Sequence, residues 1–214
     1  MQNQGFIIAK EGFPWITAAL LSTLIFILVG WSILAYLMGS LTLFVISFFR
    51  NPPRKTPKEK GAIISPADGK ICMIENVFEK RFLKQELRRV SIFMSPLNCH
   101  INRSPIHGTV KETHYNPGKF HFANVDKASD LNEQNSILLE DESQNRFVVV
   151  QIAGFIARRI ISYAKKGDHF SSGERFGLIQ FGSRVDLYLP PRTHLAVEVG
   201  QKVYGGETIL GSIA

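Results

Sequence analysis

The chain has 214 residues, a formal net charge of +7 and 45% hydrophobic residues. Its two cysteines, Cys72 and Cys99, have no metal-ligand spacing and form no disulfide framework, so we expect reduced thiols in a cytoplasmic domain. The hydrophobic residues are concentrated near the N-terminus, which argues against a uniformly soluble protein. About 160 residues follow the first 54, enough for one compact domain with its own core.

Residues 13–49 form an apolar stretch without any charged side chain. As a single helix, these roughly 37 residues would be about 55 Å long, against a hydrocarbon core of about 30 Å. We therefore predict a membrane-anchoring helical hairpin over residues 1–49, with its break near Gly30-Trp31-Ser32 or, as a second choice, Gly39-Ser40. Whether it spans the membrane or only dips into it is left open. The stretch is too long for a secretory signal peptide, and no small-residue cleavage site follows it.

Residues 50–60, with the sequence RNPPRKTPKEK, have the composition of a basic linker. Lys10 precedes the apolar stretch, and Arg50, Arg54, Lys55, Lys58 and Lys60 follow it. Positive charge prefers the cytoplasmic side, which predicts the cell (inner, cytoplasmic) membrane with the catalytic domain on its cytoplasmic side. The same residues would attract anionic lipid headgroups.

Residues 61–214 alternate between short apolar runs and turn clusters, a pattern typical of β-strands. The clearest runs are "KICMIENV", "RRVSIFMS", "ERFGLIQF", "RVDLYLP" and the hairpin "SILLEDESQNRFVVVQIAG", which has a polar turn over residues 141–145. The segment "IARRIISYA" remains ambiguous between strand and helix. We predict a mainly β fold, an antiparallel sandwich or partly closed barrel.

Two further features of this domain refine the prediction. In "RVDLYL", Val185, Leu187 and Leu189 fall on one face and Asp186 and Tyr188 on the other, as in a half-buried strand. The tail "LAVEVGQKVYGGETILGSIA" resembles the end of biotinyl- or lipoyl-type β-sandwich domains. It has no Lys at a Met-Lys-type hairpin tip, so the likeness concerns shape only.

Three turn regions carry candidate polar groups. "SPADGK" contains Asp68, "MSPLNCHINRSPIHG" contains His100 among other polar residues, and "QFGSRVD" contains Ser183. An acid, an imidazole and a hydroxyl are the parts of an activated-serine site. Gly182-Ser183 also fits a tight turn between two strands, because two-residue hairpin loops with Gly first exist.

Taken together, "FFRNPPR", "SPADG", "FMSPLNCHINRSPIHG", "NPGKFHFAN", "IARRI" and "GERFGLIQFGSRVDLYLP" closely resemble phosphatidylserine decarboxylase proenzymes. The resemblance is to the short prokaryotic branch, whose cleavage motif reads Phe-Gly-Ser-Arg, and it covers nearly the whole chain. It implies a carboxy-lyase of phospholipid biosynthesis that converts phosphatidylserine in the membrane to phosphatidylethanolamine and CO2.

The resemblance also implies that the chain cleaves itself. Ser183 would attack the carbonyl of Gly182, and the chain would separate into a β chain, 1–182, and an α chain, 183–214, which stay together as a heterodimer. Ser183 would become a covalent pyruvoyl group, which binds the substrate amine as a Schiff base. No metal, no diffusible cofactor and no nucleic-acid partner are expected.

By the same resemblance, Asp68 takes the place of the triad acid and Ser183 that of the nucleophile. Many members carry a second histidine three residues after the first, but here that position is Arg103, which cannot act as a base at neutral pH. We therefore expect His100 both to activate Ser183 as a base and later to protonate the product carbon, with His107 and His169 as alternatives. Arg103, and Arg158 or Arg159, are expected to pair with the substrate's phosphate or carboxylate.

Two other functions remain open at this stage. The pyruvoyl chemistry could act on another serine-headgroup lipid or on a soluble amino acid, although a membrane anchor favours a lipid. Alternatively, the chain could be a membrane-tethered β-sandwich that only binds partners. An uncut chain of about 24 kDa would favour the second alternative.

Overall fold

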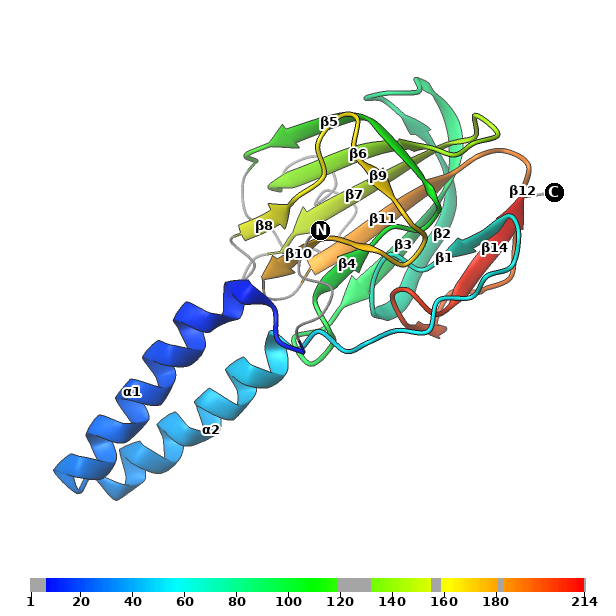
Figure 1. Cartoon of the computed structure of the whole chain (residues 1–214). Helices are drawn as coiled ribbons and strands as arrows, with labels where there is room; N and C mark the ends of the chain where they lie inside the picture. The colour runs from blue at the N-terminus through cyan, green and yellow to red at the C-terminus, as the bar shows by residue number, and fades with distance from the viewer. Residues whose placement is uncertain (1–6, 119–131, 155–158, 181–182, 214) are drawn as a thin grey trace. The chain divides into compact units, whose positions relative to one another are not determined.

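The computed structural model describes residues 7–118, 132–154, 159–180 and 183–213. The chain divides into two compact units, Met1–Pro53 and Arg54–Ala214. The first is helical and the second is built from β-strands (Figure 1). The predicted limits of the hairpin and of the basic linker, at residues 49 and 60, stay predictions.

The helical unit contains a short 3-10 helix η1 (Lys10–Gly12) and the helices α1 (Phe13–Val29) and α2 (Ser32–Phe48). The helices are separated at Gly30, which has a φ of 79°, a conformation that glycine adopts easily. Gly30 N–H donates to the Ile27 carbonyl and Trp31 N–H to the Phe26 carbonyl, the two bonds of a Schellman C-cap. The predicted break near Gly30-Trp31-Ser32 is therefore confirmed.

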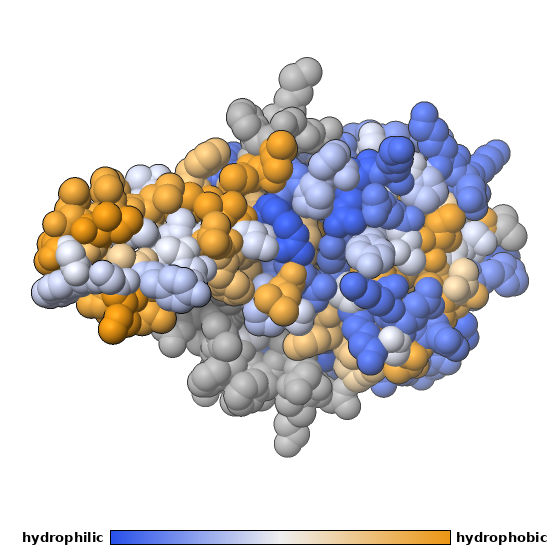
Figure 2. All heavy atoms as spheres, turned by 90° about the horizontal axis from the view of Figure 1, so that it is seen from below, coloured by the Kyte–Doolittle hydropathy of each residue, from blue (hydrophilic) through white to orange (hydrophobic). Residues whose placement is uncertain are grey.

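The helical segment Lys10–Val29, 20 residues with a mean hydropathy of 2.1, is long and apolar enough to cross a membrane. The apolar helix α2 is shorter, with 17 residues. Many large apolar side chains of both helices are exposed, including Leu28 of α1 and Ile33 and Tyr36 of α2, and the visible surface of this unit is mostly hydrophobic in Figure 2. Such a surface suits association with lipid.

The β unit consists of three antiparallel sheets. The largest has eight strands in the order β13-β2-β3-β11-β7-β6-β5-β9, and it is curled (Figure 1). The two others have three strands each, in the orders β1-β14-β12 and β4-β10-β8. The strands are β1 (Ala62–Ile64), β2 (Gly69–Glu79), β3 (Gln85–Met94), β4 (Ile101–Arg103), β5 (Gly108–Asn116), β6 (Gln134–Glu140), β7 (Arg146–Ala153), β8 (Arg159–Ser162), β9 (His169–Phe170), β10 (Arg175–Gln180), β11 (Ser183–Leu189), β12 (Thr193–Leu195), β13 (Lys202–Val203) and β14 (Ile209–Ile213).

The mainly β fold predicted from the sequence is confirmed. The hairpin β6–β7 turns at residues 141–145, and the ambiguous segment contains a strand, β8. One face of the large sheet carries the hydrophobic core, to which alternate residues of each strand contribute. On β11 these are Val185, Leu187 and Leu189, as predicted, and all three are completely buried.

The prediction that β11 is only half-buried is wrong. Arg184 and Asp186, on the opposite face of the strand, are 0% and 1% exposed. A terminal nitrogen of Arg184 donates a hydrogen bond to Asp186 Oδ2 at 3.0 Å, and Arg184 Nε lies 2.9 Å from Oδ1 in the same ion pair. A close ion pair can hold charge away from water, whereas an alternating pattern alone suggests solvent.

Candidate active site

Ser183 is the first residue of β11, in the middle of the eight-stranded sheet. It lies opposite Met94 on β3 and Ala153 on β7, and it is completely buried. Its hydroxyl Oγ lies 3.5 Å from the sulfur Sδ of Met94. A thioether is a weak acceptor, so this contact leaves the oxygen of the hydroxyl uncommitted to a strong bond. Gly182, the other half of the predicted cleavage site, lies outside the described residues.

The Gly182-Ser183 pair does not connect two strands of one hairpin. Among the described strands, β10 pairs with β4 and β8, whereas β11 pairs with β3 and β7. The chain therefore passes from one sheet to another between Gln180 and Ser183. The tight-turn interpretation of this dipeptide is wrong, because a hairpin turn requires its two flanking strands to pair with each other.

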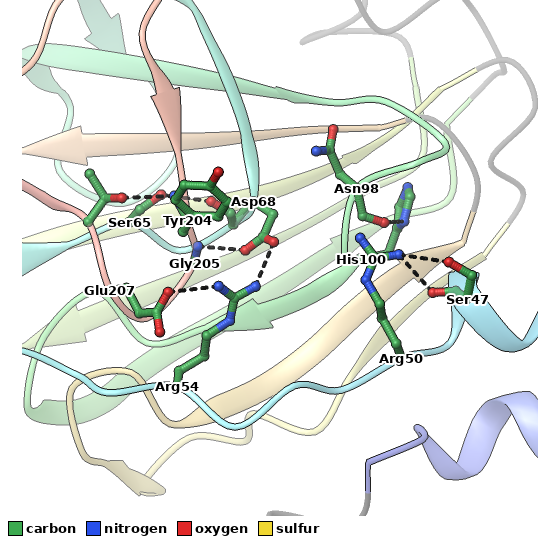
Figure 3. Close-up of polar contacts among 12 residues, drawn as sticks. Ser47, Arg50, Arg54, Ser65, Asp68, Asn98, His100, Tyr204, Gly205 and Glu207 are labelled. Atoms are coloured by element: carbon green, nitrogen blue, oxygen red, sulfur yellow. Dashed lines mark hydrogen bonds and ion pairs between the residues drawn. The ribbon is translucent and has the colours of Figure 1, made fainter.

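His100 immediately precedes β4 and lies beside the end of β10. Its carbonyl accepts a hydrogen bond from the N–H of Ile179, four residues before Ser183. The side chain is 2% exposed, and its Nδ1 lies 3.0 Å from the carbonyl of Asn98 (Figure 3). Because a carbonyl can only accept, Nδ1 must carry the proton, which makes Nε2 the basic nitrogen of a neutral imidazole.

Asn102 connects β4 to the surroundings of Ser183. Its amide Nδ2 lies 3.8 Å from Met94 Sδ, the same sulfur that Ser183 contacts. Through Met94, the structure thus brings Asn102, two residues after His100, close to Ser183.

Asp68 belongs to a different group of contacts. One carboxylate oxygen accepts from Arg54 at 2.7 Å, and the other accepts from the backbone N–H of Gly205 at 2.7 Å. Arg54 also binds Glu207 at 2.8 Å. Asp68 is 6% exposed, so this is a nearly buried ion pair. In Figure 3, the contacts of Asp68 and those of His100 form two separate groups.

Arg103 lies near Asp68, on the other face of β4 from Asn102. Its backbone N–H donates to the Pro66 carbonyl at 2.9 Å, and its guanidinium donates to the Gly173 carbonyl at 3.1 Å. Burial lowers the pKa of Arg103, and the charge of Asp68 opposes that shift. An arginine beside Asp68 therefore occupies the position at which many proteins of the family that the sequence resembles carry a second histidine.

The two other predicted substrate-binding arginines are at the start of β8. Arg159 is the first residue of this strand, opposite Gln180 of β10, and is exposed. Arg158 lies outside the described residues. Within the described ranges, no three side chains of His, Cys, Asp or Glu form a group that could hold a metal ion.

Comparison with known proteins identifies the family. The family model for phosphatidylserine decarboxylase matches residues 41–211. The chain belongs to the phosphatidylserine decarboxylase family. Proteins named phosphatidylserine decarboxylase proenzyme from Syntrophotalea carbinolica and Geotalea uraniireducens are 49% and 46% identical to it, each over 99% of both chains. A protein of the same name from Solidesulfovibrio magneticus is 47% identical over 97% of this chain and 96% of its own length. The chain is accordingly a decarboxylase, a carboxy-lyase.

Sequence reasoning did not find the partners of the predicted residues in this phosphatidylserine decarboxylase family member. The sequence places Arg54 only in the basic linker and Glu207 in the C-terminal tail, although Arg54 binds both Asp68 and Glu207. Met94 has no polar character that would draw attention to it. Asn102 alone gave a signal, because it is polar and stands two residues after His100.

Proposed function

We propose that this decarboxylase is made as a proenzyme that cuts itself between Gly182 and Ser183, and that it then decarboxylates phosphatidylserine. The observation that supports the proposal best is the position of Ser183. The serine of the Phe-Gly-Ser-Arg motif is completely buried, at the start of a central strand, and its hydroxyl lies against a thioether. Burial suits a reaction within the chain, because no external substrate has to reach the hydroxyl.

In the proposed cleavage, Ser183 Oγ attacks the carbonyl carbon of Gly182, and its proton passes to the amide nitrogen, so that an ester replaces the amide. Loss of the Cα proton of residue 183 expels the Gly182 carboxylate and leaves a dehydroalanine. Water then converts this residue to a pyruvoyl group and releases ammonia. His100 is the proposed base, because the Asn98 carbonyl fixes the proton on Nδ1 and leaves Nε2 basic.

The pyruvoyl group would supply the carbonyl that takes up the headgroup amine as a Schiff base and accepts the electron pair when CO2 leaves. Arg103, Arg158 and Arg159 are proposed to bind the phosphate or carboxylate of the substrate, since a guanidinium suits both. Phosphatidylserine is a lipid, so the apolar segment Lys10–Val29 supports a membrane-bound enzyme. We propose that the β unit lies on the cytoplasmic side, from the basic residues that flank the hairpin.

Asp68 is proposed as the acidic member of the site from its "SPADG" motif. Its contacts with Arg54 and Gly205 suggest a second role, in holding the C-terminal segment. An Asp68→Asn variant separates the two roles. If Asp68 assists the base, self-cleavage slows more than stability falls; if it only binds Arg54, stability falls and the folded fraction is cut at the normal rate.

Intact mass spectrometry of the purified full-length protein tests the proposal. We expect fragments 1–182 and 183–214, with an α-chain terminus that borohydride reduces and amines modify. Ser183→Ala should stay uncut. The matched control is Ser212→Ala, which changes another Gly-Ser pair, within β14, and should be cut normally. An active preparation containing only the uncut chain would refute the proposed chemistry.

A further inference from the structure

A ladder of three buried side-chain amides leads to the neighbourhood of Ser183. Asn135 Nδ2 donates to Gln151 Oε1 at 2.9 Å, and Gln151 Nε2 donates to Asn102 Oδ1 at 2.8 Å. Their residues are 7%, 0% and 0% exposed, respectively. The ladder connects β6, β7 and β4, which belong to two different sheets. It therefore fixes a side chain of the small sheet against the large one.

The direction of the ladder determines how the Asn102 amide is oriented. Because Oδ1 accepts from Gln151, the NH2 group is the end that points to Met94 Sδ, at 3.8 Å. A thioether is a weak acceptor, whereas an amide N–H is a full-strength donor. In a buried site, a donor of this kind gains little from sulfur and would gain much more from a charged oxygen.

Ser183 Oγ contacts the same sulfur, at 3.5 Å. When Oγ adds to the preceding carbonyl, the π electrons of that carbonyl move onto its oxygen, which becomes an oxyanion bonded to the same carbon as Oγ. Negative charge thus develops one carbon away from Ser183 Oγ, which shares its contact with Met94 Sδ with the Asn102 NH2 group.

We propose that the Asn102 amide is the hydrogen-bond donor that stabilises the oxyanion of self-cleavage, with Gln151 and Asn135 as its positioning residues. The inference rests on the proposed function and adds a residue to it. A neutral amide is suited to this role because it brings no charge into the buried site. Since the ladder already holds it in place, little reorganisation is needed when the charge appears.

The test follows the conversion of newly synthesised full-length proenzyme into its two fragments, by intact mass, in detergent or lipid nanodiscs. Asn102→Leu removes the donor, and Asn102→Asp keeps the shape and an acceptor for Gln151 while replacing the NH2 group by oxygen. Loss of one oxyanion donor typically slows a reaction by about 100- to 1000-fold, and we expect this for both variants. The matched control is Asn145→Leu, which removes a hydrogen-bonded amide from the opposite end of β7 and should be cut within about twofold of the normal rate.

Two further readouts separate this role from a structural one. The thermal midpoint of each variant reports folding, and the rate of CO2 release per pyruvoyl group reports the activity of the matured protein. We expect the folded fraction of each Asn102 variant to be cut slowly, whereas Asn145→Leu folds and is cut normally. Cleavage of either folded Asn102 variant at the wild-type rate would overturn the inference. So would equal slowing of Asn145→Leu. If the wild type itself is not cut at Ser183, the proposed function fails instead.

Discussion

The buried charge network on β11 gives a prediction whose size can be worked out from the structure. The perturbation is Asp186→Leu, which removes a carboxylate that is 1% exposed. Asp186 forms an ion pair with Arg184, with one hydrogen bond of 3.0 Å and an Nε–Oδ1 distance of 2.9 Å, and the Arg184 side chain has no exposed surface. Asp186 also lies 3.6 Å from Arg89, which has a second carboxylate, that of Glu75.

The loss of unfolding free energy depends on which carboxylate partners Arg89 and Arg184 keep in the variant. Arg89 loses one of its two carboxylates in the variant but keeps its ion pair with Glu75. Arg184 loses its carboxylate while fully buried, a change that costs about 3–5 kcal/mol of unfolding free energy. For a unit of this size, each kcal/mol shifts the thermal midpoint by about 2–4 °C. We therefore expect a decrease of about 6–20 °C.

The double variant Arg184→Leu with Asp186→Leu is the control. It removes both charges, so it should be destabilised by less than about 2 kcal/mol, and thus by less than Asp186→Leu alone. The assay is unfolding of the full chain in detergent, in a Ser183→Ala background that keeps the chain covalently intact.

Far-UV circular dichroism is the suitable signal for this assay. The two tryptophans of the chain, Trp15 and Trp31, lie in the helical unit, so tryptophan fluorescence would not report unfolding of the β unit. A loss below about 1 kcal/mol for Asp186→Leu would refute the reasoning. A double variant as unstable as the sum of the two single variants would refute it as well.

Four further predictions concern the site and its surroundings. His100→Gln should slow self-cleavage at least about 100-fold by intact mass, because it removes the proposed base; an unchanged rate would exclude His100. Arg103→Ala protein that still cleaves itself should show a lower kcat/KM for phosphatidylserine, and full activity would remove Arg103 from the substrate site. Burial raises the pKa of Glu207, but Arg54 and the Lys55 N–H lower it by more, to below the ordinary 4.5. A lowered folded pKa stabilises above the unfolded value, so the stability difference between wild type and Glu207→Gln in acid titrations should persist above about pH 5 and vanish as the pH falls through the folded pKa. Fragments 1–182 and 183–214 should co-elute in mild detergent and separate only in denaturant; separation without denaturant would contradict the heterodimer.

The arrangement of strands explains why the two fragments are expected to stay together. After a cut at residue 183, the α chain would contribute β11, β12, β13 and β14. Of these, β11 lies between β3 and β7, β13 pairs with β2, and β14 pairs with β1. Each pairing joins a strand of one fragment to a strand of the other. The proposed cut would therefore break one covalent bond and leave the hydrogen-bond ladders in place.

Much of the fold could be predicted from local pattern. Alternation identified β11 and its core residues, and glycine at the end of an apolar run identified the break at Gly30. The burial of Arg184 and Asp186 could not be predicted in this way. Hydrophobic periodicity measures which side chains avoid water, and it cannot distinguish a solvated charge from one that is paired inside the protein.

The candidate site was predictable where a motif marked it, and unpredictable where it depends on long-range contacts. Ser183 and His100 stand in recognisable segments of the sequence. The partners of Asp68 do not, because the Gly205 N–H that it accepts from is 137 residues away in the chain, and Arg54 also binds Glu207, 153 residues from it. The amide ladder likewise joins residues whose sequence separation, 49 between Asn102 and Gln151, hides their contact.

The short strand β4 connects these two parts of the site through the alternation of its side chains. Asn102 contacts Met94, as Ser183 does, whereas Arg103 lies near Asp68 and Arg54. An extended strand allows this division because successive side chains point to opposite faces. Substitution of Asn102 should therefore affect the chemistry at Ser183. Substitution of Arg103 should instead act on the ion pairs that hold the C-terminal segment, in addition to any effect on the substrate.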